Sequence, residues 1–320
     1  MITRRDVLKS LGLSLAGSLA LAGYGFGVEP MRLRVARYTV RVDTWPARQR
    51  TRIAALADLH ACRPWMSPER IEHIVDETNR LRPDLTVLLG DYTTGHRWVS
   101  GEVRAPEWSS ALSGLNAPLG VHAVMGNHDW WDDRTAQQRG RGPTIAQLAL
   151  EKAGITVYEN QVSQLRHQDH RFWIAGLGDQ LALIRRTRSG RRTFRGIDDL
   201  AGTLAKANDG APVILLAHEP DIFPQVPDRV CLTLAGHTHG GQVRLFGYSP
   251  VVPSRYGNRY AYGHILERQD ANGAKPRNLV VSVGLGNSIL PVRFGVPPEI
   301  TLIDVVGTGV LQGQTHSSSA

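Results

Sequence analysis

IAALADLH, residues 53–60, joins an apolar run directly to an aspartate and a histidine. Residues 53–57 carry only small or branched apolar side chains, which is the pattern of a buried strand. Asp58 and His60 follow at the point where that strand would end, and both are metal-ligand residue types. The stretch therefore predicts a core strand that delivers polar groups to one edge of a sheet.

Four further segments repeat this arrangement along the chain. Each follows an apolar run and carries metal-ligand residue types: Gly90-Asp91, Gly126-Asn127-His128-Asp129, Ala217-His218 and Gly236-His237-Thr238-His239-Gly240. In open α/β sheets, functional groups collect at the carboxyl ends of strands, so we expect the five segments to meet. Because unpaired carboxylates and imidazoles are costly to bury, divalent metal ions would neutralise and order such a cluster.

The spacing within these segments favours two metal ions. Asp58-x-His60 and His237-x-His239 each place two side chains on the same side of an extended turn. Asp91 stands alone, and a lone carboxylate between two such pairs is a natural bridging ligand. Two metals about 3.5–4 Å apart can activate a water and clamp a phosphoryl group. A single Asp-x-His pair is common by chance, so the chemistry is indicated by the five segments together.

In this order the segments resemble the calcineurin-like metallophosphoesterase superfamily over about residues 53 to 245. The resemblance implies an α/β (α+β) fold, a four-layer αββα sandwich of two mixed sheets with the metals at one edge. Within the superfamily, three stretches resemble exported bacterial phosphodiesterases: residues 127–131, 236–242 and 284–299.

The resemblance also implies a role for each polar residue. The ligands of a first metal would be Asp58, His60 and His239. The ligands of a second metal would be Asn127, His218 and His237, with Asp91 bridging both. Oxygen and imidazole ligands suit Mn²⁺, Fe or Zn²⁺ and do not decide between them. His128 would stabilise the transferring phosphoryl group or protonate the leaving oxygen, and Asp129 would orient His128.

The activity that the resemblance implies is hydrolysis of a phosphodiester or pyrophosphate bond by a metal-bridging hydroxide. A cell-envelope or lipid-linked phosphoester is the expected substrate. Two alternatives stay open: a broad phosphomonoesterase, and a non-catalytic surface-binding protein that keeps metal for structure. His128 speaks against the second alternative, because a structural site needs no unligated histidine. Thr94 stands where purple acid phosphatases carry a tyrosine ligand, which argues against that branch. No nucleic-acid partner is expected, because no separate nucleic-acid module accompanies the core.

The first thirty residues resemble a twin-arginine export signal. Residues 3–9 read Thr-Arg-Arg-Asp-Val-Leu-Lys, an apolar stretch follows to Gly23, and Ala20-Leu21-Ala22 fits a cleavage site. The apolar stretch is short and glycine-rich for a membrane span of about 20 residues, but an uncleaved anchor stays an alternative to release. We expect the twin-arginine translocase to deliver the chain to the periplasm, the cell wall or the outer face of the membrane. Residues 1–30 would be the signal, 31–307 the catalytic domain and 308–320 a polar tail.

The formal net charge of +8 favours anionic partners such as phosphoesters or a membrane surface, although an arginine-rich composition alone also accounts for it. Residues 184–196 hold Arg185, Arg195 and four further arginines, and we expect an exposed loop there that faces solvent or anionic headgroups. Cys62 and Cys231 are expected to lie too far apart for a disulfide.

For four residues near the segments, the sequence leaves two roles possible. Cys62 either reaches substrate or metal, or packs as a free thiol. Trp130 and Trp131 either wall a pocket or pack under the adjacent loop. Arg63 either meets a second phosphate or lies on the surface.

Apolar patterning predicts the remaining elements. Strands are expected at residues 31–43, 53–57, 85–89, 121–125, 174–177, 213–217, 232–235, 279–283 and 300–305. Helices are expected at 68–81, 145–153 and 197–207. The first helix should connect two parallel strands.

Overall fold

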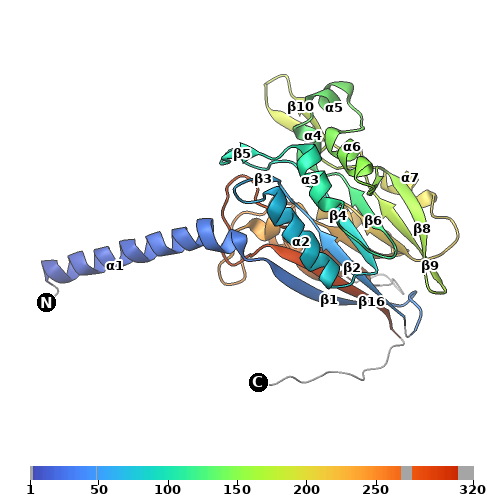
Figure 1. Ribbon diagram of the computed structural model, residues 1–320, viewed down its shortest axis with the longest axis horizontal. Coiled ribbons are helices and arrows are strands. Elements are labelled where there is room, and N and C mark those ends of the chain that lie inside the picture. The colour runs from blue at the N-terminus through green and yellow to red at the C-terminus, as the bar shows by residue number, and fades with distance from the viewer. Residues whose placement is uncertain (1–2, 48, 268–275, 309–320) are drawn as a thin grey trace.

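The computed structural model describes residues 3–47, 49–267 and 276–308, so the expected polar tail lies outside the described residues except for Thr308. Two six-stranded sheets face each other at its centre (Figure 1). The first sheet is ordered β1 (Arg34–Val42), β16 (Glu299–Gly307), β2 (Arg50–Leu56), β4 (Leu85–Leu89), β6 (Val121–Val124) and β7 (Thr156–Tyr158). The second is ordered β14 (Gly263–Glu267), β15 (Arg277–Val281), β13 (Val230–Ala235), β12 (Val213–Leu216), β9 (His170–Gly176) and β8 (Gln161–His167).

Both sheets are mixed, and helices cover their outer faces. β2, β4, β6 and β7 run parallel, whereas β16 is antiparallel to β2. In the second sheet, the edge strands β14 and β8 are antiparallel to their neighbours. The first sheet packs against α2 (Pro68–Arg80), α3 (Ala105–Leu112) and α6 (Ile145–Lys152), and the second against α7 (Leu200–Ala205) and η3 (Pro220–Gln225). The expected αββα sandwich is confirmed.

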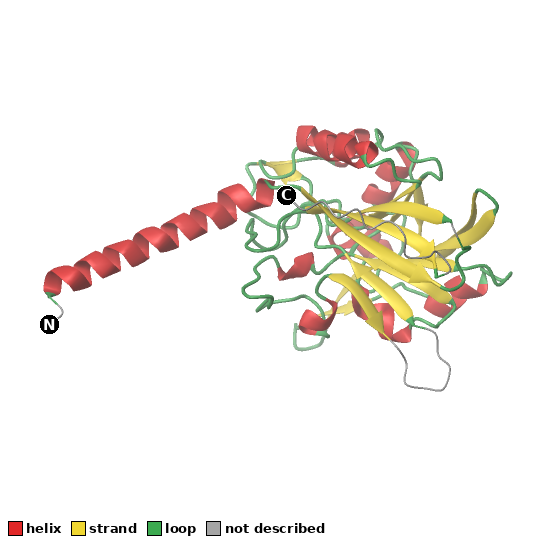
Figure 2. Ribbon diagram, turned by 90° about the horizontal axis from the view of Figure 1, so that it is seen from below, coloured by secondary structure: helices red, strands yellow, loops and turns green. Residues whose placement is uncertain are grey.

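The apolar strand runs are continuous because the strands are buried on both faces. In β2, Ile53 and Ala55 face the core between the sheets, whereas Leu56 faces the helices. The strands of the second sheet follow the same rule, with Ile214 and Leu234 toward the first sheet. The central core thereby holds the two sheets face to face (Figure 2).

All nine strands predicted from the sequence are present, with ends shifted by a few residues. The first helix begins as expected, with the Ser67 side chain accepting from Arg70 N at 3.4 Å, and it connects parallel strands. The third helix, Leu200–Ala205, is shorter than predicted. It begins later because Asp199 is its N-cap residue, whose side chain accepts from Gly202 N.

The prediction of a loop at residues 184–196 is wrong. β10 (Leu183–Arg186) and β11 (Arg192–Arg195) form an antiparallel hairpin there. Its apolar positions explain the difference, since Leu183 is buried and Phe194 stacks on Trp131. The other short elements are α4 (Asn127–Trp131), α5 (Arg134–Arg139), β3 (Cys62–Arg63), β5 (Gly101–Glu102), η4 (His239–Gly241) and η5 (Gly257–Tyr260).

The N-terminal helix α1 (Arg4–Gly23) projects from the sandwich, and none of its residues is buried (Figures 1 and 2). With the following turns it forms a helical segment of 28 residues, and an 18-residue window within it has a mean hydropathy of 1.5. The segment is long and apolar enough to cross a membrane, a property that signal sequences share. Unlike α1, the two helical turns that follow it, η1 (Tyr24–Val28) and η2 (Glu29–Met31), contain buried residues. Gly25 O accepts from Arg293 N at 2.9 Å, and the buried Glu29 carboxylate accepts from Val296 N at 2.6 Å. Residues 24–31, which the sequence assigns largely to the signal, thus pack against the domain.

Candidate metal centre

The five polar segments meet at one edge of the sandwich. Asp58, Asp91 and Asn127 lie within a few residues of the carboxyl ends of β2, β4 and β6, respectively, in the first sheet. His218 and His237 stand in the same relation to β12 and β13 of the second sheet. All except the half-buried His237 are buried. The structure therefore brings together side chains that are distant in the sequence, such as His60 and His239, which lie 179 positions apart.

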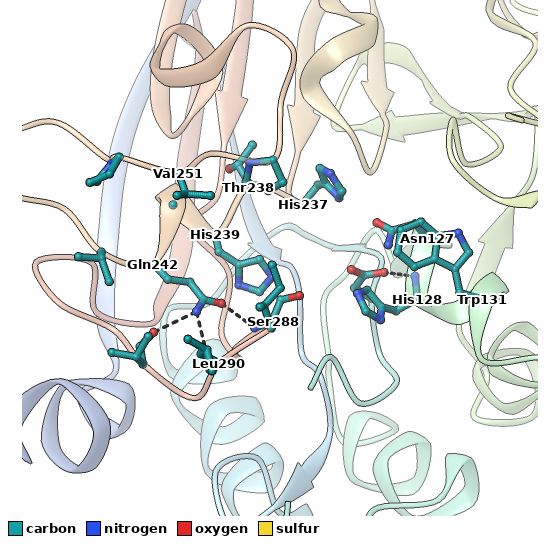
Figure 3. A pocket seen from close by; sticks show the side chains of 17 residues that line it. Asn127, His128, Trp131, His237, Thr238, His239, Gln242, Val251, Ser288 and Leu290 are labelled. Atoms are coloured by element: carbon teal, nitrogen blue, oxygen red, sulfur yellow. Dashed lines mark hydrogen bonds between the residues drawn. The ribbon is translucent and has the colours of Figure 1, made fainter. Parts of the chain in front are cut away.

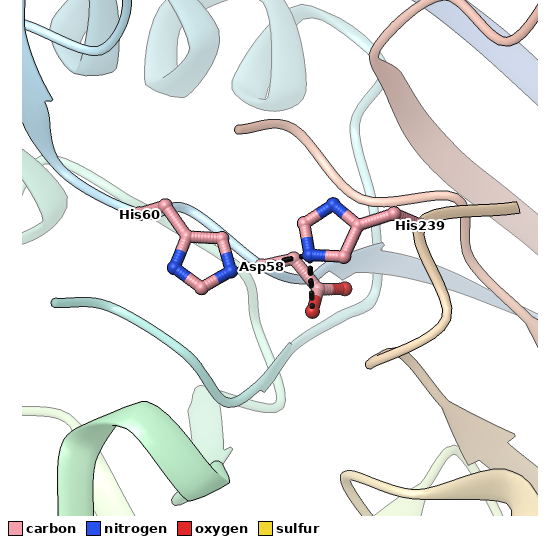
Figure 4. A group of neighbouring side chains, drawn as sticks. All are labelled: Asp58, His60 and His239. Atoms are coloured by element: carbon pink, nitrogen blue, oxygen red, sulfur yellow. Dashed lines mark hydrogen bonds and ion pairs between the residues drawn. The ribbon is translucent and has the colours of Figure 1, made fainter. Parts of the chain in front are cut away.

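One group of donors consists of Asp58, His60 and His239 (Figure 4). The Nε2 atoms of His60 and His239 lie 3.1 Å apart, and His239 Nε2 lies 3.4 Å from Asp58 Oδ1. Two imidazole nitrogens and a carboxylate oxygen thus converge on one point, which is a donor set that divalent transition metals favour.

A second group consists of Asp91, His218 and His237. His218 Nε2 lies 3.3 Å from both Asp91 Oδ2 and His237 Nδ1. Asn127 lines the adjoining cavity, and its buried Oδ1 has no hydrogen-bond partner among the described residues. Because a buried acceptor without a partner is costly, this oxygen fits a metal ligand. The residues present fit two divalent ions.

Asp91 lies between the two groups. Its Oδ2 atom is 3.5 Å from His60 Nε2 and 3.3 Å from His218 Nε2, so one oxygen faces both sets of donors. Its Oδ1 atom accepts from the backbone N–H of His128 at 2.8 Å, which fixes the carboxylate. This position is the one that a bridging ligand needs.

The backbone of these residues differs from the extended turns expected from the sequence. Asp58 and His60 have φ values of 54° and 46°, and His237 and His239 have 70° and 51°. Left-handed conformations are uncommon for residues with a Cβ and cost roughly 1–2 kcal/mol each. Each strand end therefore curls rather than continuing straight, and the paired side chains converge because of that curl.

Close packing of the loops requires glycine beside Asp91. Gly90 has a φ of 94°, and a Cβ there would lie 2.6 Å from both Gly126 N and His218 Nδ1. This close approach leaves no room for a side chain at position 90. It brings the β4 loop into contact with segments from both sheets.

Backbone carbonyls fix the orientation of two imidazoles. His60 Nδ1 lies 2.8 Å from Thr93 O, and His218 Nδ1 lies 2.6 Å from Leu89 O. A carbonyl only accepts, so Nδ1 must carry the proton in each ring. In a neutral ring, the lone pair then sits on Nε2, the atom that faces the donor groups.

Burial and charge shift the pKa values of these groups in opposite directions. Burial lowers the pKa of His60 and of His237 to about 3, which leaves both rings neutral at physiological pH. Burial raises the pKa of Asp58 to about 7, against the attraction of His218. For Asp91 and His218, burial disfavours charge, but their mutual attraction is stronger. It holds the pKa of Asp91 well below, and that of His218 well above, the usual value.

His128 belongs to neither donor group. It lines the cavity, and its ring centroid lies 4.9 Å from that of His60 and 5.2 Å from that of Trp131. Its imidazole therefore lies beside the donors without belonging to either group.

Asp129 has partners other than the expected one. Its carboxylate accepts from four backbone N–H groups at 2.8–3.3 Å, those of Asp91, Tyr92, Thr93 and Gly126. No bond from it to the His128 ring occurs among the described residues. Both oxygens are used to hold the loops after β4 and β6 together, so the expectation that Asp129 orients His128 is corrected. Burial raises the pKa of Asp132, and the nearby His128 opposes that shift. Asp132 was not singled out in the sequence.

A cavity of about 610 Å³ adjoins the donors (Figure 3). Asp91, Asn127, His128, His237 and His239 line one part of it. Trp131 lines it too, with Nε1 donating to Leu181 O at 2.8 Å.

The other residues with open roles lie away from the cavity lining. Trp130 is fully buried in the core, and Cys62 is a buried free thiol, as is Cys231. Arg63 lies 3.6 Å from Glu69. Arg192 of the β10–β11 hairpin stacks over Trp131, with 4.9 Å between its Cζ atom and the ring centroid.

Arg293 supports the centre and was missed in the sequence. Its guanidinium is fully buried and donates to the carbonyls of Val283, Gly284 and Gly286. Nη2 also lies 3.5 Å from His239 Nδ1. No local pattern distinguishes this arginine from the many exposed ones, because its partners come from loops that only the fold assembles.

Comparisons with known proteins agree with this geometry. The calcineurin-like phosphoesterase family model matches residues 51–241. The chain is similar to the uncharacterized metallophosphoesterase YkuE of Bacillus subtilis (strain 168), with 30% identity over 96% of this chain and 99% of YkuE. It is 28% identical to phosphodiesterase YaeI of Escherichia coli (strain K12), over 96% of this chain and 100% of YaeI. A solved dimetal phosphatase from Danio rerio gives a TM-score of 0.33 at 15% identity, over 73% of this chain and 88% of that one, a similarity too low to add to these matches.

The central position of Asp91 generates a first prediction. Asp91→Asn keeps the shape but removes the charge that faces both donor groups, so purified protein should lose most of its bound metal by elemental analysis. Asp132→Asn is the matched control, since Asp132 belongs to neither group, and it should keep its metal. Equal metal content in the two variants, with both folded by circular dichroism, would contradict the bridging role.

A second prediction separates metal binding from chemistry. His128→Ala should retain its metal and lose roughly 10²–10⁴-fold in rate, the usual scale for a proton-transfer or charge-stabilising group. Metal content and turnover measured on the same preparation provide the check. Loss of metal together with activity would make His128 a ligand.

Proposed function

Because this chain belongs to the calcineurin-like phosphoesterase family, we propose that it hydrolyses phosphodiester or pyrophosphate bonds with two divalent metal ions. The family uses a dinuclear divalent metal centre. The observation that carries the proposal is the Asp91 carboxylate between two groups of buried donors, beside a cavity that can hold a substrate. Mn²⁺, Fe and Zn²⁺ all suit the donor set.

The candidate ligands and His128 have different roles in this reaction. Asp58, His60 and His239 would hold one ion, Asn127, His218 and His237 would hold the other, and Asp91 would serve as a ligand to both. When bound, the ions supply Lewis acidity, which activates water and neutralises charge on the phosphoryl group. His128 faces the same cavity and either donates a hydrogen bond to the phosphoryl oxygens or protonates the leaving oxygen.

Asp129 acts on the backbone instead of on the substrate. By accepting from four N–H groups of the β4 and β6 loops, it holds Asp91 and His128 at a constant separation. The bond from His128 N to Asp91 Oδ1 joins the same two residues directly. The reacting groups are therefore positioned before a substrate arrives, which lowers the cost of reaching the transition state.

The surroundings of the donors favour a diester over a simple monoester. A diester carries organic groups on both sides of phosphorus, and a cavity of about 610 Å³ has room for them. Arg192 over Trp131 adds positive charge near one end of that cavity without contacting the donors. A monoesterase can use the same metal ligands, so the site's surroundings carry this part of the proposal.

We propose further that the chain is exported and acts on a cell-envelope phosphoester. Arg4 and Arg5 lie in the first turn of α1, an exposed helix of apolar composition at the N-terminus. Residues 24–31 pack on the domain, so cleavage after Ala22 would leave that packed segment in place.

Substrate preference is the third prediction. With Mn²⁺ added, bis-p-nitrophenyl phosphate should be cleaved with a higher kcat/KM than p-nitrophenyl phosphate, because the cavity accommodates the second ester group. His128→Ala serves as the control for contaminating activity. A clear preference for the monoester would favour the phosphomonoesterase alternative and leave the metal site intact.

Export is the fourth prediction. Changing Arg4 and Arg5 together to lysine should retain the protein in the cytoplasm, because the twin-arginine pathway reads the arginine pair. Cell fractionation followed by immunoblotting measures this, with Lys9→Arg as a matched control outside the pair. Unchanged delivery of the double variant would mean that the N-terminus is used in another way.

A further inference from the structure

The cavity has an apolar arm beyond the donor groups. On the side of His239 away from Asn127, its lining includes Val251 and Leu290 (Figure 3), and Val243 and Pro250 line the same cavity. A phosphoryl group needs none of these side chains. Their presence next to a polar centre indicates that part of the ligand is hydrocarbon.

A tight turn between the cavity-lining residues Val243 and Pro250 carries an exposed aromatic residue. Leu245 and Tyr248 exchange two backbone hydrogen bonds of 2.9 Å, and the residues between them, Phe246 and Gly247, have φ values of 49° and 87°. Positive φ at both central positions is typical of a type I′ turn, which strongly favours Asn-Gly. Phe246 is instead fully exposed, at 108% of its reference area. Neither the backbone nor solvation favours phenylalanine here, so folding alone does not explain it.

A second loop, which contributes Ile289 and Leu290 to the cavity lining, repeats this feature. Ile289 has a φ of 66° and is 73% exposed. A β-branched residue with positive φ is a genuine outlier, and such strain is concentrated at functional positions. Ile289 N donates to Gly95 O at 3.0 Å, which links this loop to a third one that carries the exposed Trp98. We define the apolar rim as Trp98, Leu245, Phe246, Tyr248, Ile289 and Leu290.

The apolar rim is continuous with the foot of α1. Arg293 N donates to Gly25 O, and the rings of Tyr24 and Phe294 meet edge to face at 6.1 Å. Arg244 N donates to Phe294 O at 2.7 Å, so the loops bearing Leu245 and Leu290 are tied to the end of α1. α1 leaves the sandwich at this end (Figures 1 and 2). A helix able to cross a membrane and the exposed apolar loops thus share one face of the molecule.

Resting on the proposed phosphoesterase function, we propose that the apolar rim docks on a lipid bilayer. The apolar arm then takes the hydrocarbon chain of a membrane lipid whose phosphoester reaches the donor groups. Exposed tryptophan, tyrosine and aliphatic side chains are the types that settle at the membrane interface. α1 in the same bilayer would hold the rim against the surface. Water adds its oxygen to phosphorus, the bond to the leaving oxygen breaks, and a proton goes to that oxygen, so no other reactant is required.

Docking is tested without reference to activity. The full-length chain carrying Phe246→Cys, labelled with a fluorophore, is placed in nanodiscs whose lipids bear bromine on the acyl chain. Leu148→Cys on α6 is the matched control, since Leu148 is exposed and does not belong to the rim. Cys62 and Cys231 are buried and should not react. We expect loss of fluorescence at position 246 and none at 148. Equal signals at both positions would overturn docking, as would sedimentation showing a dimer that covers the rim.

Substrate capture is tested with two esters of the same leaving group. Phe246→Asn in the full-length chain should lower kcat/KM about tenfold on phosphatidyl-p-nitrophenol in phosphatidylcholine nanodiscs, the scale of one lost apolar side-chain contact. Hydrolysis of bis-p-nitrophenyl phosphate should stay unchanged, because Phe246 does not line the cavity. Tm should stay equal or rise, since Asn-Gly suits the turn.

The outcomes separate the two proposals. If Phe246→Asn lowers kcat/KM equally on both esters, or lowers it on neither, lipid capture through the rim is overturned. If the unaltered chain cleaves neither ester, the proposed phosphoesterase function fails, whereas the fluorescence measurement still decides docking.

Discussion

The Asp91 carboxylate, set between imidazoles from both sheets, is the constraint on which the rest of the structure depends. One of its oxygens lies within 3.5 Å of nitrogen atoms on His60 and His218, which belong to different sheets. Such an arrangement exists only if the two sheets face each other with their strand ends in line. The apolar core between the sheets provides that alignment. Core residues such as Ile53 therefore help to set the positions of the donors although they do not contact them.

The donors are held in conformations that a short peptide would not keep. Five of the seven expected ligands have positive φ, at a cost of roughly 1–2 kcal/mol each. The surrounding loops compensate through backbone hydrogen bonds to side chains. His237 N donates to both oxygens of Asp58 at 3.0 Å, and Asp129 accepts from four N–H groups. Carboxylates thus serve in two ways here: some face the centre, and Asp129 holds the backbone that presents them.

Polar chemistry and apolar surface adjoin each other at this edge. Arg293 lies at the boundary, because its guanidinium reaches toward His239 while its backbone N–H holds Gly25 at the foot of α1. This buried residue therefore contacts both a metal-ligand candidate and the segment that follows α1.

The sequence by itself determined the class of fold and the identity of the polar cluster. Strands buried on both faces leave continuous apolar runs, and the polar residues that end those runs are local features that a one-dimensional pattern preserves. The tertiary structure alone decided how those residues converge. The left-handed backbone at Asp58 and His239, the backbone-binding role of Asp129, the buried partners of Arg293 and the packing of residues 24–31 all depend on contacts between distant segments. His60 and His239 are 179 positions apart and meet at 3.1 Å, and nothing local to either residue records that contact.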